Sequence, residues 1–99
     1  MSSGHIIVHA SIVAKPEHLE KVREVVTNIR DYARKEEEGT LIYRTSISNE
    51  NERKFEFFEE YTSKSAFDAH VAGEPFQNLS KNAKEWLEGA PVISLSTEF

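Results

Sequence analysis

The stretch Phe55-Glu56-Phe57-Phe58-Glu59-Glu60-Tyr61 decides the fold, because it alternates like a β-strand and leads within a few residues into a helical segment. Successive side chains of a strand point to opposite faces. One face of this strand therefore carries Phe55, Phe57, Glu59 and Tyr61. Ser63 is a favourable N-cap for the helix that follows, in which Phe67 and His70 share one side. A carboxylate, a phenol and an imidazole are thus expected near one apolar surface.

Three further elements are predicted upstream of this strand. Residues 5–14 alternate one fully apolar face with one mixed face, as a strand does. Residues 16–37 repeat apolar side chains at helical spacing, with Pro16 in the first turn and Gly39 just beyond the end. Residues 40–48 read as a second strand, and the polar turn 49–52 joins it to the strand 53–61 as a hairpin.

Downstream, the helical pattern is interrupted at Gly73, resumes at Pro75 and ends before a last strand over residues 92–99. The order is βαββαβ. Right-handed crossovers then give an α+β, ferredoxin-like fold, in which both helices cover one face of a four-stranded antiparallel sheet. We expect residues 1–4 to be disordered and residues 5–99 to form a single domain.

The second face of this sheet is predicted to be uncovered and of mixed character. It is expected to carry His5, Ile7, His9, Ser11 and Val13 together with Phe55, Phe57, Glu59 and Tyr61. So many aromatic side chains exceed what a monomer usually exposes. We therefore expect a homodimer with twofold symmetry, sheet against sheet, and a pocket between the two sheets.

Composition excludes several classes of function. The chain has 99 residues, no cysteine and a formal net charge of -5, which argues against a nucleic-acid surface and excludes thiolate chemistry. No long apolar run or leader-like segment is visible, so a cytoplasmic protein without a membrane span is expected. His5 and His9 share a strand face but lie about 13 Å apart at roughly 3.3 Å per residue, too far for one metal ion. Nucleotide-binding glycine motifs are also missing, and no cofactor is expected.

Several segments carry a family resemblance. They are Gly39-Thr40-Leu41-Ile42-Tyr43, Phe55 to Phe58, Glu59-Glu60-Tyr61, Ala66-Phe67-Asp68-Ala69-His70 and Glu74-Pro75-Phe76. From about Ile6 to the final strand, the chain resembles the antibiotic biosynthesis monooxygenase (ABM) domain family. The resemblance implies a dimeric α+β barrel. It also implies one of three chemistries: cofactor-free oxidation of quinols or anthrones, haem degradation, or isomerisation of a phosphorylated autoinducer sugar.

Departures from the family pattern reduce the number of these reactions that the chain is expected to catalyse. The asparagine, tryptophan and histidine on which the haem-degrading branch relies correspond to His9, Tyr61 and Ser80. All three differ, which argues against a haem oxygenase. Tyr61 in place of tryptophan is also similar to the autoinducer-processing branch. Pro75 occupies a position that is commonly a second histidine.

Three side chains are candidate catalytic bases. His70 faces inward and matches the family pattern, and imidazole titrates near neutral pH; the alternative is a packing histidine. Glu59 is either a base whose pKa is raised by burial, or a partner for an arginine such as Arg44 across the hairpin or for the dimer mate. His9 is expected to point to the interior, where it is either a base or a hydrogen-bonded structural group.

Aromatic side chains are the expected substrate-binding groups. They are Tyr61, Tyr43, Phe57 and Phe76, although aromatics on such a face can also be plain packing. Trp86 is expected in the core. His5, His18 and the acidic run 36–38 are expected to be solvated.

The favoured hypothesis is a cofactor-independent monooxygenase that acts in a pocket between the helices and the sheet of a homodimer. There a base deprotonates a quinol, phenol or anthrone, and the anion reduces molecular oxygen directly. One alternative uses the same base to isomerise a small sugar-like carbonyl compound. The other is a non-catalytic ligand-binding or stress dimer.

Overall fold

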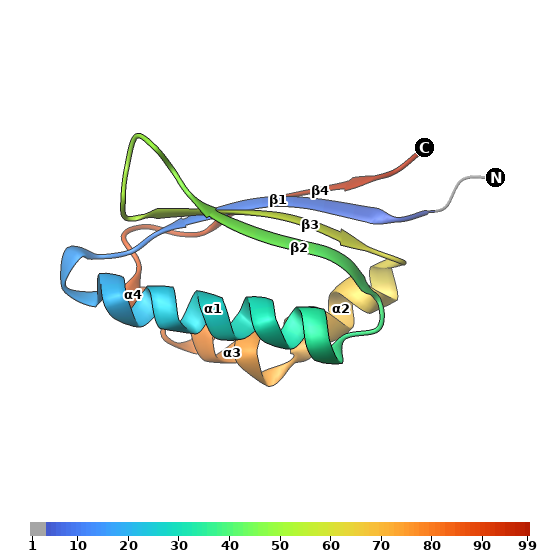
Figure 1. The fold of residues 1–99 in the computed structure, drawn as a ribbon, viewed down its shortest axis with the longest axis horizontal. Coiled ribbons are helices and arrows are strands. Elements are labelled where there is room, and N and C mark those ends of the chain that lie inside the picture. The colour runs from blue at the N-terminus through green and yellow to red at the C-terminus, as the bar shows by residue number, and fades with distance from the viewer. Residues whose placement is uncertain (1–3) are drawn as a thin grey trace.

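The computed structural model describes residues 4–99. The prediction of a disordered segment 1–4 therefore lies, except for Gly4, outside the described residues and stays a prediction. The elements follow one another along the chain as β1 (Ile6–Val13), a 3-10 turn (Pro16–His18), α1 (Leu19–Glu36), β2 (Thr40–Ile47), β3 (Lys54–Tyr61), α2 (Lys64–Ala72), α3 (Glu74–Lys81), α4 (Ala83–Trp86) and β4 (Val92–Thr97). Figure 1 shows two layers, with the helices beneath one face of the sheet. The predicted helix 16–37 therefore begins with a 3-10 turn, and the second helical region is divided into three helices.

The sheet confirms the predicted ferredoxin-like fold. Its strand order is β2-β3-β1-β4, and every neighbouring pair is antiparallel. β1 and β3 are thus the central strands, while β2 and β4 are the edges. In this arrangement each central strand has a neighbour on both sides, which leaves backbone hydrogen-bonding groups free only on the two edges.

The predicted assignment of the strand faces is wrong. Residues that pair directly across an antiparallel ladder share a face, and β1 pairs Val8 with Glu59 and His9 with Phe58. The side chains of Phe55, Phe57, Glu59 and Tyr61 are buried. They face the helices with the apolar side of β1, not the uncovered face with His9. Alternation groups the residues of each strand but does not say which group meets the helices.

The core lies between the sheet and the inner face of α1. Its members include Val22, Val25, Val26, Ile29 and Ala33 from α1, and Trp86 from α4, as predicted. Apolar burial of this kind contributes roughly 25 cal/mol for each Å² removed from water. A smaller cluster under the other end of the sheet joins Ile6, Val8 and Tyr61 to Phe67 on α2.

Two local contacts define the start of α2 and its position beside the turn that precedes β2. The Ser63 side chain accepts a hydrogen bond from the Ala66 backbone N–H at 3.1 Å, which confirms the predicted N-cap. Gly39 passes directly over this helix, because a Cβ at Gly39 would lie only 2.5 Å from the Cβ of Ala66. The turn between α1 and β2 is therefore held close to α2.

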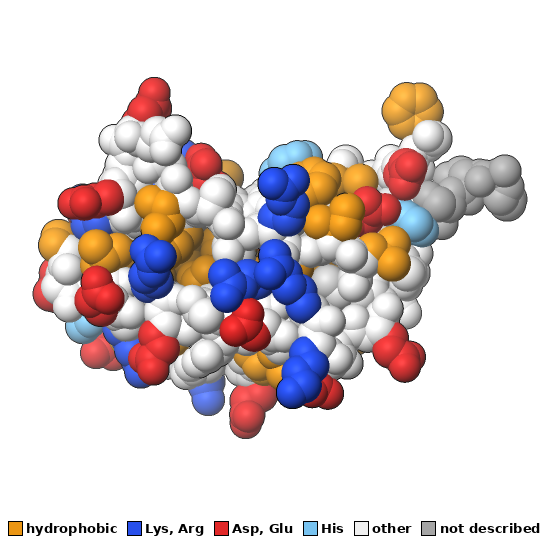
Figure 2. Space-filling view, viewed as in Figure 1, with side chains coloured by type: hydrophobic (Ala, Val, Ile, Leu, Met, Phe, Trp, Pro, Cys, Tyr) orange, Lys and Arg blue, Asp and Glu red, His pale blue; other side chains and the backbone are white. Residues whose placement is uncertain are grey.

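The edge strands leave hydrophobic side chains exposed, and Figure 2 shows such side chains among charged ones on one face of the molecule. The exposed members on β2 and β4 are Leu41, Ile42, Ile47, Val92, Ile93 and Leu95. No helix within residues 4–99 is long and apolar enough to cross a membrane.

Candidate functional site

A cavity of about 250 Å³, here called the inner cavity, lies between the sheet and the helices. It is smaller than most pockets for drug-sized ligands, which suits a small molecule. Its wall is mainly aliphatic and aromatic. The lining residues are Val8, Ala10, Ile12, Ile29, Tyr43, Phe57, Glu59, Phe67, His70, Phe76, Leu79, Ser80, Ala83, Pro91 and Ile93.

Glu59 is the buried carboxylate of this cavity. Only 5% of the residue is exposed, and the Tyr61 hydroxyl donates a hydrogen bond to its Oε1 at 2.6 Å. Burial raises the pKa of Glu59 to about 7, with a smaller increase from the negative charge of Glu37 and an opposing decrease from the Tyr61 hydrogen bond. Glu59 therefore exchanges a proton near neutral pH, as a general acid or base requires.

Two tyrosines accompany Glu59 in different roles. Tyr43 pairs with Glu59 across the β2–β3 ladder and lines the cavity, whereas Tyr61 is fully buried and lies behind Glu59 without lining it. Burial, followed by the nearby charge of Glu59, raises the pKa of both phenols above its usual value. Both hydroxyls consequently stay protonated, and that of Tyr61 donates its proton to the hydrogen bond with Glu59.

The predicted pairing of Glu59 with Arg44 does not form. Arg44 pairs with Phe58 in the ladder and so lies on the opposite face of the sheet. Within residues 4–99 no cation pairs with Glu59, and its hydrogen bond comes from the hydroxyl of Tyr61. Desolvation is therefore the largest influence on the pKa of this carboxyl group, and it raises the pKa.

His70 lies on the inner side of α2 and is 3% exposed. Its Nδ1 lies 2.8 Å from Oε1 of Glu37 and 3.1 Å from Oε2. The ring is surrounded by those of Tyr43, Tyr61 and Phe76, with centroids 5.3, 5.5 and 5.6 Å away. The imidazole is thus packed as an aromatic group while it also borders the inner cavity.

Glu37 is the site residue that sequence reasoning missed. Its run of acidic residues was expected to be solvated, but the Glu37 side chain is only 16% exposed and faces His70. The Thr40 hydroxyl donates a further hydrogen bond to its Oε1 at 2.7 Å. One signal was available: a carboxylate at a helix C-terminus opposes the helix dipole, so its presence there suggests a specific partner.

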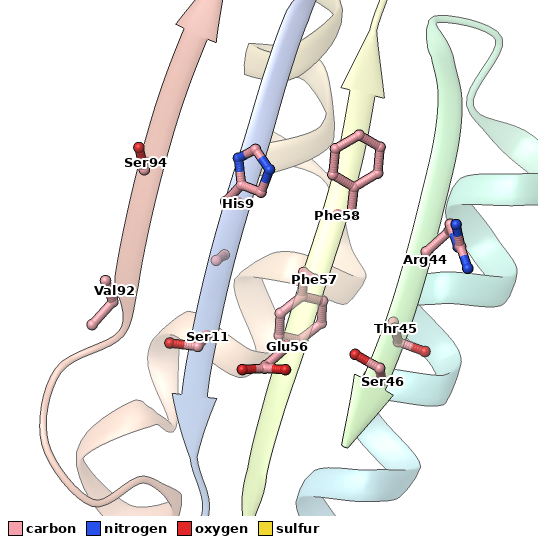
Figure 3. A pocket seen from close by; sticks show the side chains of 11 residues that line it. His9, Ser11, Arg44, Thr45, Ser46, Glu56, Phe57, Phe58, Val92 and Ser94 are labelled. Atoms are coloured by element: carbon pink, nitrogen blue, oxygen red, sulfur yellow. The ribbon is translucent and has the colours of Figure 1, made fainter. Parts of the chain in front are cut away.

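His9 does not join the other two candidate bases. Its side chain is exposed on the uncovered face of the sheet, where its ring meets that of Phe58 edge-on at 5.2 Å. Figure 3 shows His9 and Phe58 side by side there, with Glu56 further along β3 and Arg44 on the neighbouring strand β2. These groups border a shallow hollow on the open side of the sheet. The prediction that His9 and Glu59 share an interior is therefore wrong.

His5 is also paired rather than solvated. Its Nδ1 lies 2.6 Å from Oε2 of Glu60 and 3.5 Å from Oε1 of Glu98. Within residues 4–99, these three side chains form the one grouping whose spacing is compatible with a metal ion. The direct bond between His5 and Glu60 accounts for the arrangement without an ion, so we assign no metal site.

Comparison with known proteins gives a consistent result. The family model described as antibiotic biosynthesis monooxygenase matches residues 5–82. A crystal structure of a Pseudomonas aeruginosa protein has a TM-score of 0.88 at 21% identity, covering 100% of this chain and 98% of the other. A Caulobacter crescentus protein has a TM-score of 0.84 at 24% identity, with 95% and 89% covered.

A structure described as an antibiotic biosynthesis monooxygenase also has a TM-score of 0.84, at 24% identity and with 92% and 95% of the two chains covered. At these identities the likeness to solved structures concerns the fold. No curated protein matches the sequence significantly.

Proposed function

Because the chain belongs to the antibiotic biosynthesis monooxygenase family, we propose that it oxidises a small, neutral, electron-rich aromatic compound with molecular oxygen. Phenols, quinols and anthrones have the required chemistry. No flavin, haem or nicotinamide is needed, because the deprotonated substrate supplies the electrons. The inner cavity is the site of reaction.

The observation that carries this proposal is the pairing of an apolar cavity with two proton-transfer groups. Among the described residues that line the cavity, the ionisable ones are Glu59, His70 and Tyr43. Phe57, Phe67 and Phe76 provide aromatic surface on which a planar ring packs well. No lysine or arginine belongs to this lining, and a buried carboxylate repels anions, which favours a neutral substrate over a phosphorylated sugar.

We assign the role of base to His70. It takes a proton from the phenolic oxygen or from the activated carbon of an anthrone, and the resulting anion transfers one electron to O2. The substrate radical and superoxide then combine, and the peroxide takes up a proton. For an anthrone, loss of water converts the CH2 group to a carbonyl group, so that one oxygen atom of O2 enters the product and the other forms water.

Glu59 has a complementary role in this scheme. Because burial raises its pKa to about 7, the carboxyl group is partly protonated at neutral pH and can donate a hydrogen bond to a substrate oxygen. Tyr61 holds Glu59 in place and is not itself a substrate-binding residue, since it does not line the cavity. Tyr43, Phe57 and Phe76 are the proposed substrate contacts.

Oxygen uptake with a panel of quinols and anthrones tests the proposal. We expect His70→Ala to lower turnover by about 10²-fold or more, the usual effect of removing a general base. His18→Ala is the matched control, because this imidazole lies in the 3-10 turn and outside the cavity lining. Far-UV circular dichroism shows whether each variant is folded.

Two results would contradict the assignment. Exchange of substrate carbon-bound hydrogen in deuterated water, without oxygen uptake, would indicate the isomerase alternative. Ligand binding with neither reaction would indicate a non-catalytic dimer.

A further inference from the structure

We propose that Glu37 is a positioning residue for His70: it accepts a hydrogen bond from Nδ1–H and thereby holds the imidazole in the tautomer whose Nε2 presents a lone pair to the inner cavity. This inference rests on the proposed function, in which His70 is the base. It assigns a role to a carboxylate that lies outside the cavity lining.

The contact geometry supports a specific pairing. Both oxygens of Glu37 lie within hydrogen-bond distance of Nδ1, at 2.8 and 3.1 Å. His70 is almost completely buried, and Glu37 is itself mostly covered, with 3% and 16% of the side chains exposed. Thr40 Oγ1 donates to Glu37 Oε1 at 2.7 Å, so the carboxylate is held from a second direction.

The two nitrogens of His70 face different spaces. His70 borders both the inner cavity and a separate outer hollow, whereas Glu37 and Thr40 border only the outer hollow. Nδ1 is directed at Glu37 and therefore at the outer side. The described part of the chain provides no hydrogen-bond partner for Nε2. Every fully buried side-chain nitrogen in that part does have a partner, so Nε2 is not fully buried and can be reached from a neighbouring space. Nε2 is consequently the nitrogen available to a molecule in the cavity.

The surrounding packing keeps this orientation fixed. Three aromatic rings, those of Tyr43, Tyr61 and Phe76, surround the imidazole. The segment that carries Glu37 and Thr40 is held close to α2 by the contact of Gly39 with Ala66, at a spacing that leaves no room for a Cβ on Gly39. The carboxylate and the imidazole therefore come from two elements that are packed directly against each other.

The chemical consequence follows from the acid–base properties of imidazole. A neutral imidazole has one nitrogen that donates and one that accepts. If Nδ1 donates to a carboxylate, Nε2 is the acceptor, and the imidazolium formed after proton uptake is stabilised by the same negative charge. Removing Glu37 leaves the tautomer undefined and the imidazolium without its counter-ion.

Nitrogen-15 NMR of histidine-labelled protein at about pH 8, where an ordinary imidazole is neutral, tests the proposal without any substrate. We expect His70 to carry its proton on Nδ1 in the wild-type protein, with its signals identified by their loss in His70→Ala. In Glu37→Ala the tautomer should become mixed or shift to Nε2–H. Thr40→Val, which removes only the second hold on the carboxylate, should give a smaller shift in the same direction. Glu38→Ala is the matched control, because this neighbouring carboxylate is exposed, and it should give the wild-type spectrum.

Steady-state kinetics gives a second measure. In Glu37→Ala we expect kcat to fall by about 10-fold or more, as for other groups that orient a functional histidine, with a smaller change in KM. If the wild type turns over no member of the panel, the proposed function fails while the tautomer result still stands on its own.

A wild-type His70 with its proton on Nε2, or protonated on both nitrogens at this pH, would overturn the proposal even if Glu37→Ala did not fold. A folded Glu37→Ala variant that kept the wild-type tautomer, or the wild-type kcat on an accepted substrate, would also overturn it.

Discussion

At the scale of single residues, the site is defined by how each ionisable group is partnered. Glu59 has a phenol as its partner and lies in an apolar wall, so burial controls its protonation. His70 has a carboxylate as its partner and is surrounded by aromatic rings. These two environments differ enough to support two different proton-transfer roles in one cavity.

The pKa of Glu59 predicts a specific pH dependence of stability. Its folded-state pKa, about 7, is raised above the ordinary value of 4.5, so between these pH values the folded state holds a proton that the unfolded state has lost. The stability of the wild type relative to Glu59→Gln should therefore fall as pH rises from about 4.5 to about 7 and then become level. The total change should be up to about 3 kcal/mol.

Urea denaturation of both proteins at a series of pH values measures this difference. Glu56→Gln, on the opposite face of the same strand, is the matched control and should keep the wild-type slope. If the wild-type and Glu59→Gln stabilities ran parallel through this range, the account of Glu59 as a desolvated carboxyl group would be incorrect.

At the scale of elements, the sequence was sufficient for the order of the strands and of the main helical regions, because apolar periodicity and the signals at Ser63, Gly39 and Gly73 are local. It did not predict the 3-10 turn over Pro16–His18 or the separate short helix α4. It was insufficient for the choice between the two faces of β3. That choice depends on which face meets the helices, and no period-two pattern contains this information. For the same reason, His9 was wrongly placed with Glu59. Glu37 was missed for a different reason: its partner His70 is 33 residues away in the chain, and no local pattern indicates that contact.

The uncovered face of the sheet leads to a second proposal, that two copies associate through it as a homodimer. This face carries Phe58 and His9 on the central strands, and Ile42 on β2 remains 37% exposed. We expect Phe58→Asp to shift the protein towards monomers, because it removes an aromatic side chain from the contact and burying the added carboxylate there costs free energy. Tyr32→Asp on α1, where the tyrosine is 41% exposed, is the matched control and should leave association unchanged.

Sedimentation velocity at micromolar concentration decides this question. A wild-type protein that sediments as a monomer would rule out the dimer. A Phe58→Asp variant that remained as fully associated as Tyr32→Asp would place any interface elsewhere.

At the scale of the whole molecule, the two faces of the sheet carry different groups of side chains. The helix-covered face contains the inner cavity, with Glu59 from the central strand β3 and His70 from α2. The open face carries His9 and Arg44, and the hollow there is lined by neither Glu59 nor His70. The groups that we propose for the chemistry therefore all come from one copy of the chain, and the proposed association through the open face adds none of them.

Isotope labelling tests most directly whether oxygen from O2 enters an aromatic substrate bound in this cavity. An anthrone or quinol that the protein accepts is converted under 18O2, and the product is analysed by mass spectrometry, with the His70→Ala variant run in parallel. We expect an anthrone to gain one labelled oxygen atom at the oxidised carbon. The rate should depend on His70, and added flavin, haem or nicotinamide should have no effect. A product that carries only oxygen from water, or labelling at the same rate with His70→Ala, would contradict this expectation.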